Sequence, residues 1–259
     1  MTSPLGRTAR PSEELTDIEL CIEKIVPGGE GFARLPDGQP VFVRAAAPGD
    51  RIRLRSLQKQ RGRWVTEDYQ LVLPSAERTS PECPVAATCG GCDLMHLRRD
   101  SELRQKASML REALERGAGV SPDAPAAVEE VGPVLGYRAR VRFHVGKHGK
   151  LGFFARASHQ LVEVPSCAVA HPDIVRALGM IRRLARRFPE ALPGFSDVEL
   201  RATTSGVLAR FFPRDGIKPI RAEPFLRALG KELSVAATER EAQAISERRE
   251  LPGGVYVDV

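Results

Sequence analysis

The chain has few aromatic residues and no long hydrophobic run. Aromatic side chains make up 5% of the 259 residues, with a single tryptophan. No apolar segment approaches the roughly 20 residues that a helix needs to span a bilayer. The first residues, MTSPLGRTARPSEEL, also lack the apolar stretch of a secretory signal. We therefore expect a soluble, cytoplasmic protein without a membrane partner.

Long helical segments are also disfavoured, because 20 prolines and 23 glycines imply many turns and short elements. The hydrophobic fraction of 42% still allows a sizeable core. The length suits one large domain or two smaller ones.

Positive charge exceeds negative charge, by a net +6, and it is concentrated in two blocks. Seven basic residues between positions 44 and 63 accompany one acid, Asp50, and six between positions 136 and 160 accompany none. Two such blocks are typical of nucleic-acid binding, although part of each could be a solvated surface without a ligand. The candidate RNA-binding residues are Arg51, Arg53, Arg55, Lys59, Arg61, Arg63, Arg138, Arg140, Arg142, Lys147 and Lys150, with Trp64 as a stacking partner for an unpaired base.

Alternating apolar and polar residues predict short strands in the first third of the chain, as in Arg51-Ile52-Arg53-Leu54-Arg55. Turn signals at close intervals there indicate a small β-barrel. A helix is expected from Asp100 to about Arg116, with Leu103, Ala107, Leu110 and Leu114 on its apolar face, and another from Pro172.

The predicted fold class is α+β. We expect a flexible tail at 1–15, a small β-barrel at 16–75, a cluster loop and helix at 76–120, and a mixed α/β RNA-binding domain at 121–259.

Three of the five cysteines, Cys83, Cys89 and Cys92, follow the spacing C-x5-C-x2-C, with two glycines between the last two. Thiolates at this density in a reducing compartment indicate a metal site, and a cluster of several irons needs a fourth thiolate. Cys167, in a short loop between an expected strand and helix, is the candidate. A structural role is favoured for such a cluster, and redox sensing is the alternative.

Other interpretations of the cysteine pattern stay open. Zinc could bind the same thiolates, His96 could replace one of them, or the thiols could be buried without a ligand. Cys21 is expected to be an ordinary thiol.

Several segments together resemble the RNA (uracil-5-)-methyltransferases that act on 23S ribosomal RNA. These segments are GGEGFAR, VFVRAAAPGDRIR, CPVAATCGGCDLMHL, YRARVRF and GFFARASHQLVEVPSCAVAHP. The resemblance implies a TRAM domain, which is an oligonucleotide-binding barrel, in the first part. It also implies a [4Fe–4S] cluster on Cys83, Cys89, Cys92 and Cys167, and ribosomal rather than transfer RNA as the partner.

Members of that family continue into a domain with an S-adenosylmethionine site, a nucleophilic cysteine and a general base. Here neither of the glycine pairs at 29/31 and 117/119 both follows a strand and opens a helix, and no remaining cysteine is a credible nucleophile. The sequence therefore predicts an RNA-recognition, cluster-carrying N-terminal part of a uracil-C5 methyltransferase, with no catalytic residue and inactive alone. S-adenosylmethionine is then expected only with a further C-terminal domain, and a separate methyltransferase subunit is a candidate partner. The alternative is a stand-alone iron–sulfur or zinc RNA-binding protein without catalysis.

Overall fold

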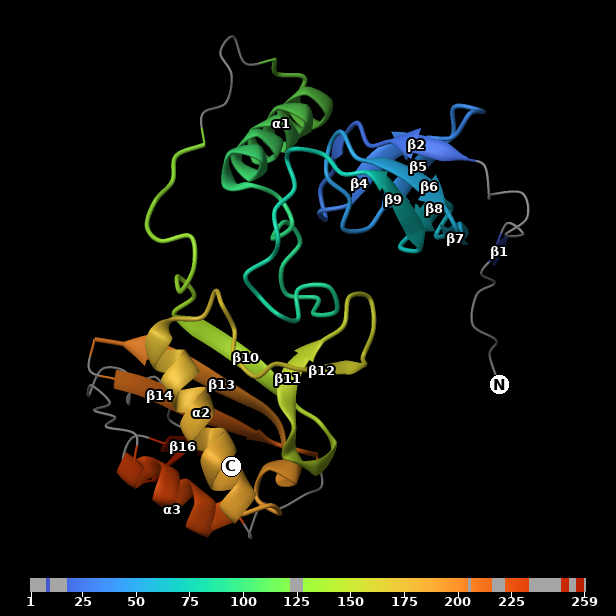
Figure 1. Ribbon diagram of the computed structural model, residues 1–259. Helices are drawn as coiled ribbons and strands as arrows, with labels where there is room; N and C mark the ends of the chain where they lie inside the picture. The colour runs from blue at the N-terminus through green and yellow to red at the C-terminus, as the bar shows by residue number, and fades with distance from the viewer. Residues whose placement is uncertain are drawn as a thin grey trace. The chain divides into compact units, whose positions relative to one another are not determined.

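The computed structural model describes residues 8–9, 18–121, 128–204, 206–215, 222–232, 248–251 and 255–258. The chain divides into two compact units. The first unit comprises residues 1–87 and 92–130, and the second comprises residues 88–91 and 131–259. Several sheets and three α-helices occur in the described parts (Figure 1), which confirms the α+β class. None of these helices is both long and apolar enough to cross a membrane.

The first unit contains two small sheets that share one hydrophobic core. Their strand orders are β1-β7-β8-β5-β4-β3 and β2-β6-β9. The strands are β1 (Thr8–Ala9), β2 (Glu19–Cys21), β3 (Lys24–Ile25), β4 (Gly31–Arg34), β5 (Pro40–Val43), β6 (Arg51–Leu54), β7 (Gln58–Gln60), β8 (Arg63–Thr66) and β9 (Tyr69–Leu73). Leu20, Val41 and Ile52 from three of them lie in the same buried cluster. The short strands expected here are present, and their closure into a TRAM-type barrel stays a prediction.

The predicted alternation of buried aliphatic residues and arginines on opposite faces is confirmed in β6. Ile52 and Leu54 are buried in the core, whereas Arg51 and Arg53 lie on the opposite face. Because successive side chains of a strand point to opposite faces, the pattern alone determined which residues are buried.

A buried carboxylate fastens the segment that follows these sheets. Asp50 has no exposed surface, and it accepts hydrogen bonds from the backbone amides of Ala47 (2.6 Å) and Ser75 (2.9 Å). Arg78 Nε donates to both Asp50 oxygens, at 2.8 and 2.9 Å. Since a buried charge is tolerated when it is paired and hydrogen-bonded, Asp50 ties residues 75–78 to the sheets.

Helix α1 (Arg99–Ala118) matches the helix expected at 100–116, but its packing differs from the expectation. The predicted apolar face is only partly covered: Leu110 is 49% exposed, and Ser101 is the helix residue that is buried. Met109 packs against a small buried cluster, and polar contacts also attach the helix, including an ion pair at 2.7 Å from Lys24 on β3 to Glu112. The apolar spacing therefore predicted the helix correctly and its buried side poorly.

The second unit is one sheet with two helices on one face. The strand order is β12-β11-β10-β13-β14-β16-β15, with β14 and β16 parallel and the other pairs antiparallel. The elements are β10 (Arg140–Val145), β11 (Leu151–Phe154), β12 (Leu161–Glu163), α2 (Pro172–Arg187), β13 (Phe195–Thr203), β14 (Gly206–Pro213), α3 (Glu223–Glu232), β15 (Arg248–Leu251) and β16 (Val255–Asp258). The helix expected from Pro172 is confirmed.

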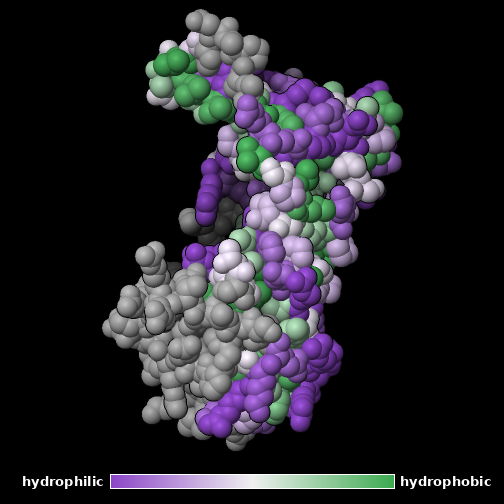
Figure 2. Space-filling view, turned by 90° about the vertical axis from the view of Figure 1, so that its left-hand side faces the viewer, coloured by the Kyte–Doolittle hydropathy of each residue, from purple (hydrophilic) through white to green (hydrophobic). Residues whose placement is uncertain are grey.

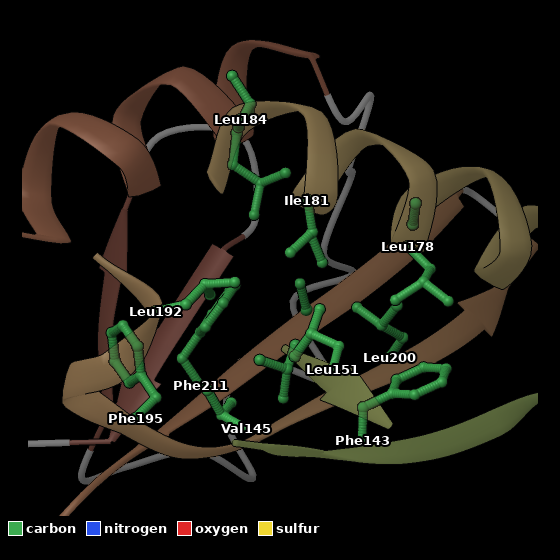
Figure 3. Packing of buried hydrophobic residues seen from close by; sticks show 14 of the residues in the cluster. Phe143, Val145, Leu151, Leu178, Ile181, Leu184, Leu192, Phe195, Leu200 and Phe211 are labelled. Carbon is green, nitrogen blue, oxygen red and sulfur yellow. The ribbon is translucent and has the colours of Figure 1, made fainter. Parts of the chain in front are cut away.

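Helices α2 and α3 cover the sheet through a large apolar core (Figure 3). Leu178, Ile181 and Leu184 from α2 pack toward Phe143 and Phe211 of the strands. Each fully buried side chain of this size contributes about 1.5–3 kcal/mol. The opposite face of the sheet carries the alternating polar residues of the same strands, and this places Arg140 and Arg142 of the second basic block there.

Candidate nucleic-acid interface and cysteine loop

No disulfide joins the described cysteines: Cys83, Cys89, Cys92 and Cys167 are half-buried, and Cys21 is exposed. By donor type, four thiolates suit an iron–sulfur cluster. Within the described ranges, however, no three His, Cys, Asp or Glu side chains are placed as ligands of one metal ion. Metal binding by the four predicted cysteine ligands therefore stays a prediction.

The turn that bears Cys89 contacts the end of β11. Cys89 forms an isolated antiparallel bridge with Ala155, and the Gly90 amide donates to the Phe154 carbonyl oxygen at 3.0 Å. A Cβ atom on Gly90 would lie 2.9 Å from that oxygen and 3.0 Å from the Arg156 nitrogen. A side chain would crowd this backbone approach, so glycine is required at this position.

His96 was an alternative metal ligand, and the structure gives it another role. Its ring is buried, with Nε2 3.0 Å from the Ala46 carbonyl oxygen. Burial lowers the pKa of His96, in spite of the opposing hydrogen bond to Ala46. The imidazole thus helps to attach the cysteine loop to the first unit.

The first basic block is partly neutralised by acids from other strands. Glu19 on β2 pairs with Arg53 at 2.6 Å and with Arg51 at 3.1 Å. The hydrogen bond from Arg53 is the main cause that lowers the pKa of Glu19. Arg63 pairs with Glu30 at 2.6 Å and lies 3.6 Å from the centre of the Phe42 ring.

Trp64 is half-buried against the first core, and its indole nitrogen donates to Gln39 Oε1 at 2.8 Å. The Lys59 ammonium lies over the ring at 5.5 Å, and Lys59 is exposed, as are Arg55 and Arg61. In the view of Figure 2, hydrophilic residues form patches that alternate with more apolar ones. Base stacking by Trp64 stays a prediction, as does phosphate binding by the three exposed cations.

The second basic block lies mostly on and beside β10. The side chains of Arg138 and Lys147 are exposed, and Lys150 pairs with Glu163 at 3.2 Å. Arg140 pairs with Glu199 on β13 at 2.8 Å. RNA binding by these residues stays a prediction.

Asp197 on β13 was missed by the sequence reasoning. It pairs with Arg142 at 3.0 Å and with His144 Nδ1 at 2.6 Å, and it accepts a hydrogen bond from the Ser196 hydroxyl at 2.7 Å. Burial raises the pKa of Asp197, but these hydrogen bonds outweigh it, so the pKa is lowered. The alternation in DVELRA could have placed Asp197 and Glu199 on one face, but the register against β10 could not be read from the sequence.

No family model matches the chain. A 23S rRNA (uracil(1939)-C(5))-methyltransferase of Halomonas elongata is 34% identical over 192 residues, which are 73% of this chain and 39% of the relative. An uncharacterized RNA methyltransferase of Halalkalibacterium halodurans is 27% identical over 221 residues, or 82% of this chain and 46% of the relative. The chain thus spans less than half the length of these relatives.

A solved structure has a similar fold. The tRNA (uracil-54, C5)-methyltransferase of Pyrococcus abyssi, in complex with S-adenosyl-L-homocysteine, superposes with a TM-score of 0.55 and 24% identity. The superposition covers 78% of this chain and 48% of that one.

The sequence predicted an RNA-recognition part of a methyltransferase that is inactive alone. The comparisons show that this prediction is wrong. The relatives whose alignments cover 73% and 82% of this chain are named methyltransferases. The superposed structure is that of a methyltransferase with a bound S-adenosyl compound. The alternative prediction, a stand-alone iron–sulfur or zinc RNA-binding protein without catalysis, is wrong for the same reason. The chain is homologous to RNA methyltransferases, uracil-C5 methyltransferases among them.

Proposed function

We propose that this chain acts in RNA (uracil-C5) methylation, with S-adenosylmethionine as the methyl donor and ribosomal RNA as the substrate. The similarity over 192 residues to a 23S rRNA (uracil(1939)-C(5))-methyltransferase carries this proposal. The transfer RNA enzyme supports it only through its fold, and the relative with higher identity favours ribosomal RNA.

The two basic blocks are the proposed RNA contacts. In the first unit these are Arg51, Arg53, Arg55, Lys59, Arg61, Arg63 and Trp64, and in the second Arg138, Arg140, Arg142, Lys147 and Lys150. Their exposed cations support the proposal, because phosphate neutralisation releases counterions. The acids Glu19 and Glu199 hold Arg53 and Arg140 in fixed positions, so part of the ordering cost of binding is already met.

S-adenosylmethionine supplies the methyl group when it is bound. Among the described residues, Gly29 lies in the turn before β4, and Gly117 and Gly119 lie at the end of α1. Neither glycine pair follows a strand and opens a helix, which is the arrangement of a glycine-rich cofactor loop. The residues proposed as RNA contacts would hold the substrate of this reaction.

A [4Fe–4S] cluster on Cys83, Cys89, Cys92 and Cys167 is part of the proposal. Donor chemistry supports it, as does the presence of four half-buried thiols that form no disulfide. Anaerobically purified protein is expected to have a broad absorption band at about 400 nm and to contain about four iron atoms per chain. Replacement of Cys167 by Ser should abolish both. Stoichiometric zinc without the band would contradict this cofactor.

Methyl transfer is tested with ribosomal RNA transcribed with tritium at C5 of uracil. Methylation at C5 displaces that hydrogen, so the chain with S-adenosylmethionine should release tritium into water, and omission of the donor should prevent it. Absence of both release and methyl incorporation would contradict the proposed function.

RNA binding is tested through its salt dependence. If about six phosphates are contacted, the log–log slope on single-stranded RNA should be near −4, because each contact contributes about −0.7. The triple variant Arg55→Gln, Lys59→Gln, Arg61→Gln should flatten the slope by about 2. Arg116→Gln, an exposed cation on α1, is the matched control and should leave the slope unchanged. A wild-type slope flatter than −1 would exclude contacts by both blocks.

A further inference from the structure

The sheet of the second unit presents an ordered polar and aromatic face opposite its helices. On β10, Val141, Phe143 and Val145 are buried, so Arg140, Arg142 and His144 lie on the other face. The register places His144 beside Asp197 of β13, and Asp197 beside Phe212 of β14. One step along, Arg142 lies beside Glu199, and Glu199 beside Arg210. Strands from distant parts of the sequence thus build one continuous surface.

Aromatic rings and guanidinium groups are stacked across this surface. The His144 and Phe154 rings lie 3.9 Å apart with an interplanar angle of 11°, and His159 meets Phe154 edge-on at 5.4 Å. The guanidinium carbons of Arg142 and Arg210 lie 4.0 and 4.4 Å from the centre of the Phe212 ring. Phe153, by contrast, stacks on Phe143 at 5.1 Å, on the core side. Only the second of the two adjacent phenylalanines contributes to the outer face.

Asp197 fixes two of these planar groups. It binds Arg142 and His144 at the same time, and its own side chain is 11% exposed. The side chains of Arg142 and His144 remain 48% and 34% exposed. Because rotation of both groups is restricted while part of their surface stays in contact with solvent, they can receive a planar ligand with little loss of side-chain entropy.

We propose that the outer face of β10, β11, β13 and β14 is a stacking site for an unpaired base of single-stranded RNA, with phosphates held by Arg140 and Arg201. Unpaired bases stack on aromatic rings and on guanidinium planes, which are the groups gathered here. Four arginines, at positions 140, 142, 201 and 210, face two carboxylates at 197 and 199. The surface therefore keeps a positive excess for the backbone of the same nucleotide. This site deepens the proposed function and rests on it.

Duplex RNA fits this surface poorly. Bases in a helix are stacked on one another, so they cannot use the half-buried rings of this face, and a duplex would meet only the phosphate-binding arginines. The site thus selects a loop, bulge or unstacked segment.

The test uses the full chain and a short single-stranded RNA with one 2-aminopurine, whose emission falls on stacking. Phe154→Leu keeps an apolar side chain and removes the ring. Base–aromatic stacking is worth about 1–3 kcal/mol, so affinity should fall about fivefold to a hundredfold and quenching should decrease. The salt slope should stay constant, because no cation is lost. Phe154→Tyr should restore both affinity and quenching.

Phe188→Leu is the matched control, because Phe188 lies at the end of α2 and packs at the core edge. It should leave affinity and quenching unchanged. If Phe154→Leu fails to fold by circular dichroism, His144→Gln removes the other stacked ring and should give the same loss. Unchanged affinity and quenching in the folded ring variant, or an equal effect on a duplex, would overturn the stacking site.

The two proposals fail in different ways. If the wild-type chain binds no RNA, the proposed function fails as well. If it binds RNA with a steep salt dependence and Phe154→Leu binds equally well, only the stacking site is wrong.

Discussion

Removal of the Arg78 side chain tests the role of the buried ion pair with Asp50. The pair distance is 2.7 Å, and Asp50 has no exposed surface, so Arg78→Ala leaves a carboxylate uncompensated in the interior. Breaking a buried pair in this way costs about 3–5 kcal/mol. Asp50 keeps two hydrogen bonds from the backbone amides of Ala47 and Ser75. Because these still stabilise the carboxylate, the expected loss of unfolding free energy is at the low end of this range, about 3 kcal/mol.

The chain provides its own probe for this experiment. Trp64 is the sole tryptophan of the sequence, and it packs against the core of the first unit, so its fluorescence reports the unfolding of that unit. With a urea m-value of about 1–3 kcal/mol/M, the midpoint should fall by about 1–3 M. Arg104→Ala removes a partner of an exposed pair with Asp100 and should not shift the midpoint measurably. A loss below about 1 kcal/mol for Arg78→Ala would refute the argument.

Three further changes should have distinct effects. Because the pKa of His96 is lowered in the folded chain, its contribution to stability is complete above pH 6.5, the usual pKa of histidine, and is lost as the pH falls below that value. His96→Gln should therefore flatten the dependence of the urea midpoint on pH between about 7 and 5. Gly152→Ala would place a Cβ 1.9 Å from the Val162 carbonyl oxygen, so a lower melting temperature by circular dichroism is expected as β11 and β12 separate. Phe211→Ala empties a buried site of the second core and should cost about 3–5 kcal/mol in the same experiment; an unchanged melting temperature in either variant would contradict the described packing.

The spacing of apolar residues along the sequence predicted many of the strands and helices, because each of these elements must bury its apolar residues. The period of two in Arg51–Arg55 correctly placed Ile52 and Leu54 in a core. The proline at the start of α2 correctly indicated where this helix begins. In α1 the same spacing misled, since a helix attached by polar contacts such as Lys24–Glu112 does not need a covered apolar face.

The candidate site was less accessible from the sequence because it depends on the pairing of distant strands. Arginines at 140 and 142 were recognised as surface cations, but their partners Glu199 and Asp197 lie 59 and 55 residues away. Register across a sheet is not encoded in either strand alone. The sequence therefore suggested a uniformly basic surface, whereas the structure has arginines held in place by acids and backed by aromatic rings.

The contact between Gly90 and β11 links the cysteine loop to the aromatic face. Cys89 and Phe154 lie far apart in sequence, yet the bridge from Cys89 to Ala155 and the hydrogen bond from the Gly90 amide to the Phe154 carbonyl oxygen restrict how far their backbones can move apart. A shift of the backbone at Cys89 would therefore be transmitted through these contacts to the end of β11, where Phe154 lies. The backbone positions of Cys89 and Phe154 are thus coupled although the two residues lie on separate segments of the sequence.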